Sequence, residues 1–389
     1  MRFISINPSL KFSKCHWVLC SLLLLPFTGH NQYTSGESYF GANNYVEYIV
    51  GDMPIIIVAP HGGYIEPETL PIIGPHQRDN GTLVTSQALV DSIVAQTGGC
   101  RPHLIINHLH PTKMNPTHDI DSAAGTNLDA RQAWNDFHNF IEDAKTEVTD
   151  ESGKGHYFEI HGNGHAEMWT EIGLGVSKDY LNDSDSVILS RVGLSTVKNL
   201  CTVEGADFLE IIQGPTSLGG LLDARGWNSV PSPSNPAPGN GGFFYAGWNT
   251  WLHGSRYSGT IDATHIENYY AFMQTASRAQ YAGDLAESIL IFMEVHYGFL
   301  LNCNTETLEE NTNDLTPIIY PNPTWGVSGF QLLNGDNVRQ VRISNAIGME
   351  IERTLDPSLI FLKDADAGVY IVSMDLKQGF PVNYRVVVR

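Results

Sequence analysis

The stretch Pro54-Ile55-Ile56-Ile57-Val58-Ala59-Pro60-His61-Gly62-Gly63 decides the fold class. Five consecutive apolar residues, most of them β-branched, stand between two prolines. Strands that are buried on both faces have this composition, because helices cover both sides of a parallel sheet. The stretch therefore predicts a central strand of an α/β sheet, and this strand ends at a histidine followed by two glycines.

Similar strands recur along the chain, and segments with helical periodicity lie between them. Residues 126–148 carry alanine, tryptophan, phenylalanine and isoleucine on one helical face, which is typical of an amphipathic helix. Alternating strands and helices predict an α/β fold with a mixed central sheet flanked by helices. The other predicted elements are strands at 102–108, 155–161 and 259–267 and helices at 81–97 and 281–300.

The length and the charge of the chain limit its architecture and its partners. A chain of 389 residues exceeds what one hydrophobic core usually organises, so two domains are expected. The formal net charge of −20 repels nucleic acid, and no nucleic-acid partner is expected. The acidic, Asn/Thr-rich stretch at 302–314 predicts a linker. The expected domains are an α/β domain at 36–301, a linker at 302–316 and a β-rich module at 317–389.

The first 30 residues have the layout of a secretory signal peptide. Arg2, Lys11 and Lys14 precede an apolar run at 17–27, and small polar residues follow it. This run is about half of the roughly 20 residues that a transmembrane helix needs, so a membrane anchor is the weaker interpretation. We expect residues 1–30 to be cleaved and the protein to be exported.

Three cysteines remain after the predicted cleavage: Cys100, Cys201 and Cys303. An odd number allows at most one intramolecular disulfide, and the sequence leaves its pairing open. There is no Cys-x-x-Cys spacing, which argues against a zinc site built from thiolates. We therefore expect these cysteines to be structural.

Short alternating runs after residue 317 predict a small antiparallel β-sandwich. The module resembles the type IX secretion sorting domain, which implies a partner, the type IX secretion machinery. It also implies a location, either secreted or on the outer-membrane surface of a Gram-negative bacterium. The alternative is an accessory β-domain, such as a carbohydrate-binding one. The matching motifs are Tyr320-Pro321-Asn322-Pro323-Thr324 with Gly326, residues 341–348, residues 367–372 and the basic, β-branched end 385–389.

Two of the predicted strands end in a histidine followed by glycine, at His61 and at His161. Ligands of open α/β sheets bind just beyond the carboxyl ends of the strands. Glu66 follows His61 across a short loop that contains two glycines. Two histidines and one glutamate hold a catalytic zinc and leave a position open for water. His61, Glu66 and His161 are therefore the predicted metal ligands, and His165 is an alternative to His161 or its hydrogen-bond partner.

Residues 59–67 look like the first metal motif of the zinc-dependent poly-γ-glutamate hydrolases. Residues 48–300 as a whole resemble the N-formylglutamate amidohydrolase group of the carboxypeptidase-like superfamily. The resemblance implies a zinc-carboxypeptidase-like fold, one zinc ion per chain and hydrolysis of an amide or peptide bond. The other matching segments are 101–111, 127–141, 159–161, 252–255 and 261–267.

The same resemblance assigns a catalytic residue. In the family, a late strand ends in a glutamate that activates the zinc-bound water, and this role falls on Glu267. A carboxylate at a strand end near a metal can take a proton from water and return it to a leaving amine. Glu294 is a rival, but it lies on a predicted helix, where a solvated role is the default.

One departure from the family concerns the substrate. Relatives carry an Asn-Arg-Asp element after the second strand, and its arginine binds the substrate carboxylate. Here His118 stands in place of that arginine, and a monodentate, titratable ring cannot reproduce the guanidinium fork. The substrate therefore stays open. The candidate substrate-binding residues are Lys113, His118, Arg131, His253 and Ser255, with Arg225 and Arg256 as further cations.

Two functional hypotheses follow from the sequence. The first is an exported zinc hydrolase acting on peptides or amide-linked polymers, with Glu267 as the general base. The second is a surface-displayed binding protein on a degenerate hydrolase scaffold, and His118 is its main support. Stoichiometric zinc in the folded protein would favour the first hypothesis.

Overall fold

The computed structural model describes residues 33–303, 318–320, 331–333, 338–345, 349–354, 368–377 and 382–388. The predicted signal peptide at 1–30 and most of the predicted linker at 302–316 lie outside the described residues. Much of the C-terminal motif sequence, including residues 321–330, also lies outside them. Among the helices within the described ranges, none is both long and apolar enough to cross a membrane.

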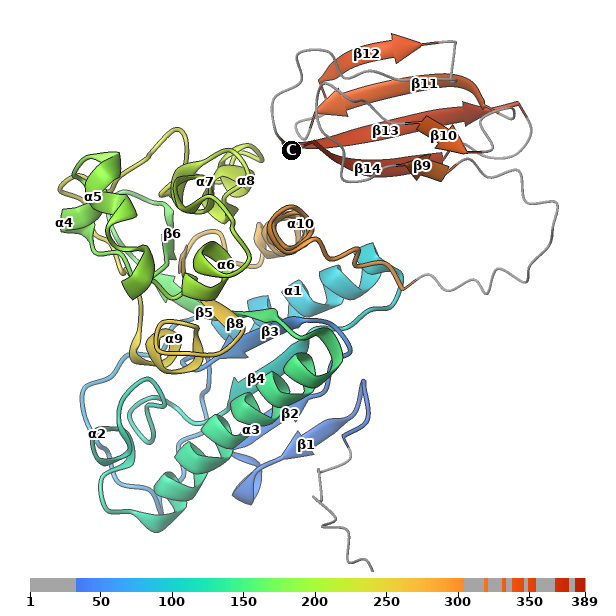
Figure 1. Cartoon of the computed structure of the whole chain (residues 1–389). Helices are drawn as coiled ribbons and strands as arrows, with labels where there is room; N and C mark the ends of the chain where they lie inside the picture. Colours follow the sequence, from blue (N-terminus) through green and yellow to red (C-terminus); the bar gives the residue numbers. More distant parts are fainter. Residues whose placement is uncertain are drawn as a thin grey trace, which may run out of the picture. The chain divides into compact units, whose positions relative to one another are not determined.

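A mixed eight-stranded sheet forms the centre of residues 33–303 (Figure 1). Its strand order is β1-β2-β4-β3-β5-β8-β6-β7. The central strands β4, β3, β5 and β8 run parallel, and β2 and β6 flank them in the antiparallel direction. The strands are β1 (Ser38–Phe40), β2 (Val46–Ile49), β3 (Ile55–Ala59), β4 (His103–Asn107), β5 (Gly155–Asn163), β6 (Thr170–Gly173), β7 (Ser229–Val230) and β8 (Ile261–Tyr269).

The strand predicted from residues 54–63 is β3, and all five of its residues are buried. It lies between β4 and β5, so it is hydrogen-bonded on both edges. A strand in this position has to be apolar on both faces, because helices cover both sides of the sheet. The predicted α/β class, with a mixed sheet flanked by helices, is confirmed.

Three long helices cover the two faces of the sheet. Helices α1 (Thr82–Thr97) and α10 (Arg278–Tyr297) lie together on one face, and α3 (Leu128–Ser152) lies on the other (Figure 1). The shorter helices are η1 (Ala42–Asn44), α2 (Ile120–Ala124), α4 (Lys178–Leu181), α5 (Asp185–Leu189), η2 (Val192–Leu194), α6 (Lys198–Thr202), α7 (Phe208–Gln213), α8 (Leu218–Asp223) and α9 (Trp248–His253).

Local sequence signals set the bounds of α3. The side chain of Asn127 accepts a hydrogen bond from the backbone N–H of Ala130, which satisfies a donor that the first helical turn leaves unpaired. At the other end, Gly153 adopts a left-handed conformation with φ of 73°, which glycine reaches without steric cost. The helix is therefore capped at both ends by residues suited to the task.

The alternation along β5 separates an apolar face from a polar one. Phe158 and Ile160 pack in the same apolar cluster as Leu89 of α1 and Leu285 of α10. Successive residues of a strand point to opposite faces, so Glu159 and His161 project away from these helices. The polar side chains of β5 therefore face the side of the sheet that α3 covers.

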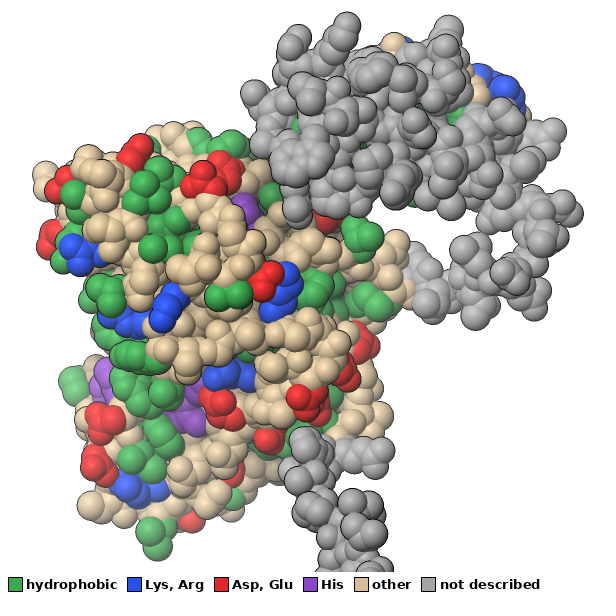
Figure 2. Space-filling view, in the orientation of Figure 1, with side chains coloured by type: hydrophobic (Ala, Val, Ile, Leu, Met, Phe, Trp, Pro, Cys, Tyr) green, Lys and Arg blue, Asp and Glu red, His purple; other side chains and the backbone are tan. Residues whose placement is uncertain are grey.

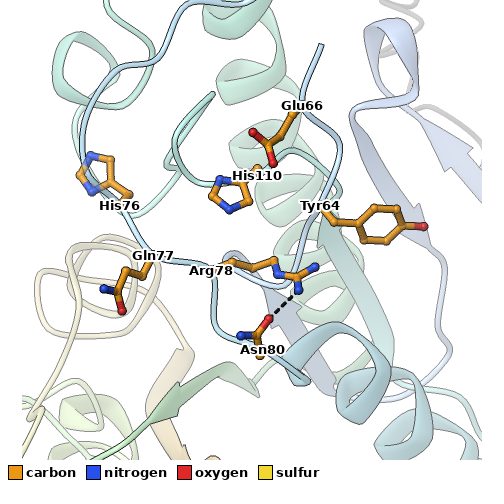
Figure 3. Close-up of a pocket in the computed structure, with 7 residues that line it drawn as sticks. All are labelled: Tyr64, Glu66, His76, Gln77, Arg78, Asn80 and His110. Atoms are coloured by element: carbon orange, nitrogen blue, oxygen red, sulfur yellow. Dashed lines mark hydrogen bonds between the residues drawn. The ribbon is translucent and has the colours of Figure 1, made fainter. Parts of the chain in front are cut away.

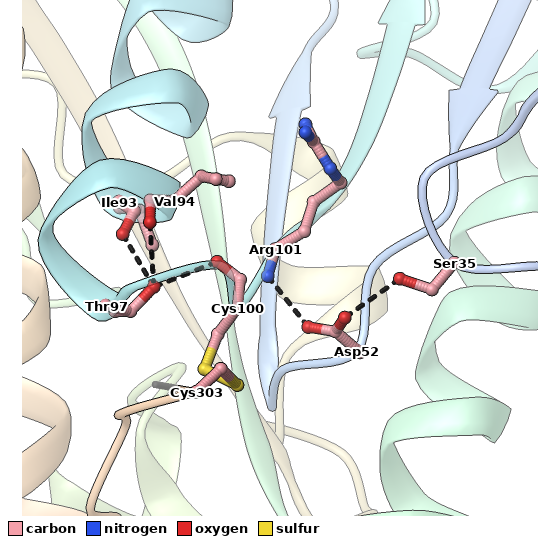
Figure 4. The surroundings of a disulfide bond; sticks show 8 residues. All are labelled: Ser35, Asp52, Ile93, Val94, Thr97, Cys100, Arg101 and Cys303. Atoms are coloured by element: carbon pink, nitrogen blue, oxygen red, sulfur yellow. Dashed lines mark hydrogen bonds between the residues drawn. A yellow bond between two sulfur atoms is a disulfide. The ribbon is translucent and has the colours of Figure 1, made fainter. Parts of the chain in front are cut away.

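A disulfide joins Cys100, just before β4, to Cys303, beyond α10 (Figure 4). The backbone N–H of Cys303 also donates to the carbonyl of Thr97 at 2.7 Å. The cysteine pairing that the sequence left open is thus Cys100 with Cys303, and Cys201 is a free thiol. The bond ties the last residues of the α/β domain back to the end of α1.

The described C-terminal strands are antiparallel, in agreement with the predicted all-β module. They form a four-stranded sheet in the order β12-β11-β13-β14 and a β10-β9 pair. Apolar residues on one side of the larger sheet, among them Val341, Val372 and Val386, share a separate small core. The strands are β9 (Ile318–Tyr320), β10 (Gln331–Leu333), β11 (Val338–Asn345), β12 (Glu350–Thr354), β13 (Gly368–Leu376) and β14 (Val382–Val388).

Candidate metal centre

The ends of three parallel strands bring His61, His161 and Glu267 together. His61 follows β3, His161 lies near the end of β5 and Glu267 near the end of β8. His161 and Glu267 are register partners on adjacent strands, so both side chains project from the same face. The rings of His61 and His161 meet edge to face, with their centroids 4.7 Å apart. Histidine side chains also gather at the surface beside α9 (Figure 2).

Asp79 is the carboxylate that lies between the two histidines. Its Oδ2 is 3.0 Å from Nδ1 of His161 and 3.4 Å from Nδ1 of His61. Ligand atoms of the three residues all lie within 4.8 Å of one another, so a single metal ion could contact all three. The backbone N–H of Asp79 donates to the carbonyl of His61 at 3.2 Å, which holds the two residues together. We call His61, Asp79 and His161 the outer group.

A hydrogen bond to Asn115 fixes the ring of His61. The backbone N–H of Thr117 donates to Oδ1 of Asn115 at 3.1 Å, which identifies this atom as the amide oxygen. Nε2–H of His61 therefore donates to the same oxygen at 2.7 Å. Metal-ligating histidines usually donate their second ring N–H in this way. Nδ1 of His61 thus presents a lone pair toward Asp79.

A second set of ligand atoms shares His161. Atoms of Glu159, His161 and His265 also lie within 4.8 Å of one another, and all three residues are buried. Nε2 of His161 is 2.7 Å from Oε1 of Glu159, so its two ring nitrogens face different carboxylates. The ring of His265 lies 4.5 Å from that of His161 between centroids. We call Glu159, His161 and His265 the inner group.

The electrostatics of both groups favour a positive charge between the carboxylates. Burial opposes ionisation of Asp79, but the hydrogen bond from His161 holds its pKa below the ordinary value. Burial also opposes ionisation of Glu159, yet the hydrogen bond from His161 lowers its pKa to about 2. Burial disfavours the imidazolium form of His161, but its bonds to Asp79 and Glu159 raise its pKa well above the usual range. A metal cation would supply the same positive charge.

Glu267 has a second carboxylate, Glu171, beside it on the sheet. Glu171 in β6 is the antiparallel register partner of Glu267. Its buried side chain accepts hydrogen bonds from Nδ1 of His165 at 2.5 Å and from the backbone N–H of Phe244 at 2.6 Å. Burial and the charge of Glu267 raise the pKa of Glu171 to about 7, against the effect of these bonds. His165 therefore pairs with Glu171 and belongs to neither metal group.

Two cavities flank residues 76–80, the segment that carries Asp79. One has a volume of about 520 Å³ and is shown in Figure 3. The other has a volume of about 500 Å³, and Asp79 itself lines it. Gln77, Arg78 and Asn80 line both cavities. Open space of the size that binds small molecules or short peptide segments therefore reaches the outer group.

Glu66, the predicted third ligand, lines the first cavity and is in neither metal group (Figure 3). Its neighbour Ile65 explains this position. The N–H of Ile65 donates to the carbonyl of His108, and the N–H of His110 donates to the carbonyl of Ile65, both at 2.9 Å. This pairing holds the loop along the continuation of β4 and leaves Glu66 exposed. Among the described residues, Asp79 rather than Glu66 is the carboxylate grouped with His61 and His161.

Of the predicted substrate-binding residues, His118 lies beside a cavity. Its ring is 5.5 Å between centroids from that of His76, which lines the first cavity. The ammonium group of Lys113 is buried and donates to a backbone carbonyl at 2.8 Å. The guanidinium of Arg131 is 2.7 Å from a carboxylate of α2. Lys113 and Arg131 therefore have structural partners.

His253 and Ser255 are hydrogen-bonded to other side chains, and neither belongs to a metal group. Nδ1 of His253 lies 2.8 Å from Oε1 of Glu142 on α3. The hydroxyl of Ser255 donates to Asp262. Asp262 precedes Glu267 by five residues on β8, and an odd separation along a strand places the two side chains on opposite faces. The structure therefore does not bring Ser255 to the polar face.

Arg78 is a cation that no motif in the sequence singles out. Arg225 is 3.2 Å from the carboxylate of Glu287, and Arg256 donates to a backbone carbonyl. Arg78 donates to the side-chain oxygen of Asn80 at 2.5 Å (Figure 3) and has no carboxylate partner among the described residues. Because it also lines both cavities, its charge is available to a bound molecule.

Sequence reasoning also missed three ligand candidates, Asp79, Glu159 and His265. Glu159 and His265 each precede a predicted site residue by two positions on the same strand. A period of two places such pairs on one face, so this signal was present in the sequence. Asp79 lies in the irregular segment before α1, where no periodicity applies. Glu294, the rival of Glu267, belongs to α10, on the opposite face of the sheet.

Comparison with known proteins leaves the chain without an assigned family. No family model matches it, and no curated protein matches it. It is similar to the N-formylglutamate amidohydrolase from Ralstonia eutropha JMP134, with 12% identity over 65% of this chain and 99% of that one and a TM-score of 0.39. It is also similar to the gene product Atu2144 from Agrobacterium tumefaciens, with 15% identity over 63% of this chain and 93% of that one and a TM-score of 0.37. Likenesses at this level do not assign an activity, so the function is inferred from the site.

Proposed function

We propose that this protein is an exported zinc-dependent hydrolase that cleaves an amide or peptide bond. One observation carries the proposal. His61, Asp79 and His161 present three ligand atoms within 4.8 Å of one another, and Glu267 is the register partner of His161 on the next strand. Two histidines and a carboxylate, with a coordination position left open, are typical of catalytic zinc sites.

The chemistry of the outer group fits zinc. Imidazole nitrogens with one carboxylate oxygen suit zinc, whereas magnesium and calcium prefer sites made of oxygen atoms alone. The side chains of His61 and Asp79 are each 16% exposed, so the group is open to water on one side. When bound, zinc lowers the pKa of a coordinated water toward neutrality and polarises a carbonyl oxygen.

Glu267 is the residue best placed to move protons. Its Oε1 accepts a hydrogen bond from Nε2–H of His265 at 3.0 Å, which leaves the second oxygen for a water molecule. A carboxylate in this position takes a proton from water and returns it to the leaving amine. Glu171, next to it on β6, has its pKa raised to about 7 by burial and by the charge of Glu267, so it exchanges protons near neutral pH.

Arg78 supplies the cation that the substrate side of the site needs. It lies between the two cavities and immediately precedes Asp79. A guanidinium offers several donors in a rigid fork, which suits a substrate carboxylate or the oxyanion that forms during hydrolysis. Arg78 can thus replace the arginine that His118 displaces. We therefore propose that the scissile bond of the substrate lies beside the metal position at Asp79. Arg78 would then bind an acidic or carbonyl oxygen of the substrate.

Hydrolysis assays and zinc content test the proposal together. The full chain, purified with zinc, is assayed on N-acyl amino acids and on peptides, with amine release as the readout. His61→Ala should lose the zinc ion of the outer group and turnover, and Arg131→Ala, a change at an ion pair away from the cavities, should keep both. A stable, folded wild-type protein that holds no zinc would overturn the proposal and favour the surface-displayed binding protein.

Export is part of the same proposal. The signal-like residues 1–30 and the resemblance of residues 317–389 to a type IX sorting domain both support it. The Cys100–Cys303 disulfide supports it independently, because disulfides persist mainly in oxidising compartments. We propose a secreted or outer-membrane-surface location in a Gram-negative bacterium, reached through the type IX machinery.

Cell fractionation tests the proposed route. Deletion of residues 317–389 should trap the protein in the periplasm and leave its hydrolase activity intact, because the candidate site lies within residues 61–267. Secretion of the truncated protein at the level of the full chain would contradict the sorting role.

A further inference from the structure

The inner group contains a ligand atom without a partner. Nε2–H of His265 donates to Oε1 of Glu267 at 3.0 Å, which makes Nδ1 the nitrogen with the lone pair. Nδ1 of His265 is buried and has no hydrogen-bond partner among the described residues. Leaving a buried polar atom unpaired is unfavourable, because the atom loses its hydrogen bonds to water. A histidine oriented in this way, with a carboxylate on one nitrogen and a lone pair on the other, is typical of a metal ligand.

Further ligand atoms lie close to His265. Glu159, His161 and His265 each offer one, and the three atoms lie within 4.8 Å of one another. Oε1 of Glu159 is 2.7 Å from Nε2 of His161. The second oxygen of Glu159 accepts a hydrogen bond from the hydroxyl of Tyr157, which fixes the carboxylate. A Cβ at Gly247 would lie 3.4 Å from Nδ1 of His265 and 3.7 Å from Oε1 of Glu159. Glycine at this position thus keeps the space beside both ligand atoms open.

The juxtaposition, rather than the unpaired nitrogen alone, distinguishes this site. Nε2 of His103 is also buried without a hydrogen-bond partner in the part of the chain that the structure describes. His103, however, belongs to no group that could hold a metal ion. His265 combines an unpaired nitrogen with a buried carboxylate and a second histidine.

We infer that the inner group is a second metal position, held by Glu159, His161 and His265. It shares His161 with the outer group, because Nδ1 of His161 faces Asp79 and Nε2 faces Glu159. An imidazole ring bridges two metal ions in this way when both nitrogens act as ligands. The donor set of two nitrogens and one carboxylate oxygen suits zinc or copper. This position goes beyond the proposed hydrolase, which requires only the outer group.

The two positions differ in their access to water. The side chains of Glu159, His161 and His265 are 0%, 4% and 6% exposed, compared with 16% for His61 and Asp79. Substrate therefore reaches the outer position only. An ion at the inner position balances the buried charge of Glu159 and holds the shared ring of His161. Its role is to position a ligand of the outer ion.

Zinc stoichiometry in matched variants tests the inference. Glutamine at position 265 can still donate from its amide nitrogen to Glu267, but it lacks the atom that corresponds to Nδ1. By mass spectrometry, the full-length wild type should hold two zinc ions per chain, and H265Q and His61→Ala one each. His103→Asn, which alters the other buried histidine with an unpaired nitrogen, should hold two.

The outcomes separate this inference from the proposed function. Equal zinc content in wild type and H265Q would overturn the second position. A single zinc ion that is lost in H265Q but kept in His61→Ala would confirm the inner position and refute the outer one. Should H265Q fail to fold, anomalous scattering at the zinc edge from wild-type crystals gives the answer. Two peaks, one on each side of His161, confirm the inference, and a single peak beside His61 and Asp79 refutes it.

Discussion

Oδ2 of Asp79 lies 3.0 Å from Nδ1 of His161, although 82 residues separate them in the chain. The same oxygen accepts a hydrogen bond from the backbone N–H of Gly162 at 3.3 Å, so the segment before α1 is anchored to the end of β5. Asp79 also approaches His61. The position of this carboxylate therefore decides whether the two histidines form a metal centre.

Glu267→Gln should separate catalysis from metal binding. The amide keeps the shape of the side chain but cannot accept a proton, so kcat should fall by about 10²- to 10⁴-fold, the usual contribution of a general base. Zinc content should stay at the wild-type level, because Glu267 belongs to neither metal group. Glu294→Gln, on the opposite face of the sheet, is the matched control and should keep its kcat. A fully active Glu267→Gln protein would assign the base elsewhere.

Arg78→Ala should weaken substrate binding more than the chemical step. A hydrogen bond to a charged group contributes about 1.5–3 kcal/mol, so KM should rise roughly 10- to 100-fold for the best substrate. Arg225→Ala removes an arginine that pairs with Glu287 instead, and KM should be unchanged. Steady-state kinetics of the two variants checks this. Similar KM values in both would rule out contact between Arg78 and the substrate.

The sequence predicted the fold well because its strongest signals are local. An apolar run such as Ile55–Ala59 has few structural alternatives, and buried strands of this kind specify a sheet covered on both faces. The strand ends at His61 and His161 could also be predicted from the sequence, because a histidine followed by glycine marks the point where the chain leaves a sheet. The predicted class therefore agrees with the observed one.

The carboxylate of the metal group was harder to predict. The closeness of Glu66 to His61 in sequence predicts that it is a ligand, but the pairing of Ile65 with residues 108–110 places Glu66 in the neighbouring cavity. Asp79 reaches the histidines only because residues 76–80 fold back over the strand ends. Such a return depends on long-range contacts, which no period in the sequence encodes.

Loss of the disulfide should destabilise the α/β domain. Cys100 and Cys303 are 203 residues apart, so the bond restricts a very long loop of the unfolded chain. Removal of a native disulfide typically lowers the free energy of unfolding by about 2–4 kcal/mol. Urea unfolding of the Cys100→Ser, Cys303→Ser double variant should show this decrease, and Cys201→Ser, which removes a free thiol, should show much less. Equal unfolding midpoints in wild type and the double variant would contradict a stabilising role.

The contact between Glu142 and His253 should make stability depend on pH in the acid range. Burial opposes ionisation of Glu142, but hydrogen bonds from His253 and Lys145 lower its pKa to about 2. An unfolded glutamate has a pKa of about 4.3, so the unfolded chain binds the proton first as the pH falls. The stabilisation is therefore complete above about pH 4.3 and is lost toward pH 2. Between pH 5 and pH 3, the urea midpoint should fall more in wild type than in Glu142→Gln, and parallel decreases would refute this contribution.

The central claim is that Asp79, and not Glu66, completes the zinc site with His61 and His161. The most direct test is the zinc content of purified full-length Asp79→Ala and Glu66→Gln by mass spectrometry, each compared with wild type. Asp79→Ala should lose the zinc ion of the outer group, and Glu66→Gln should retain the wild-type content. Loss of zinc in Glu66→Gln with full retention in Asp79→Ala would contradict the account.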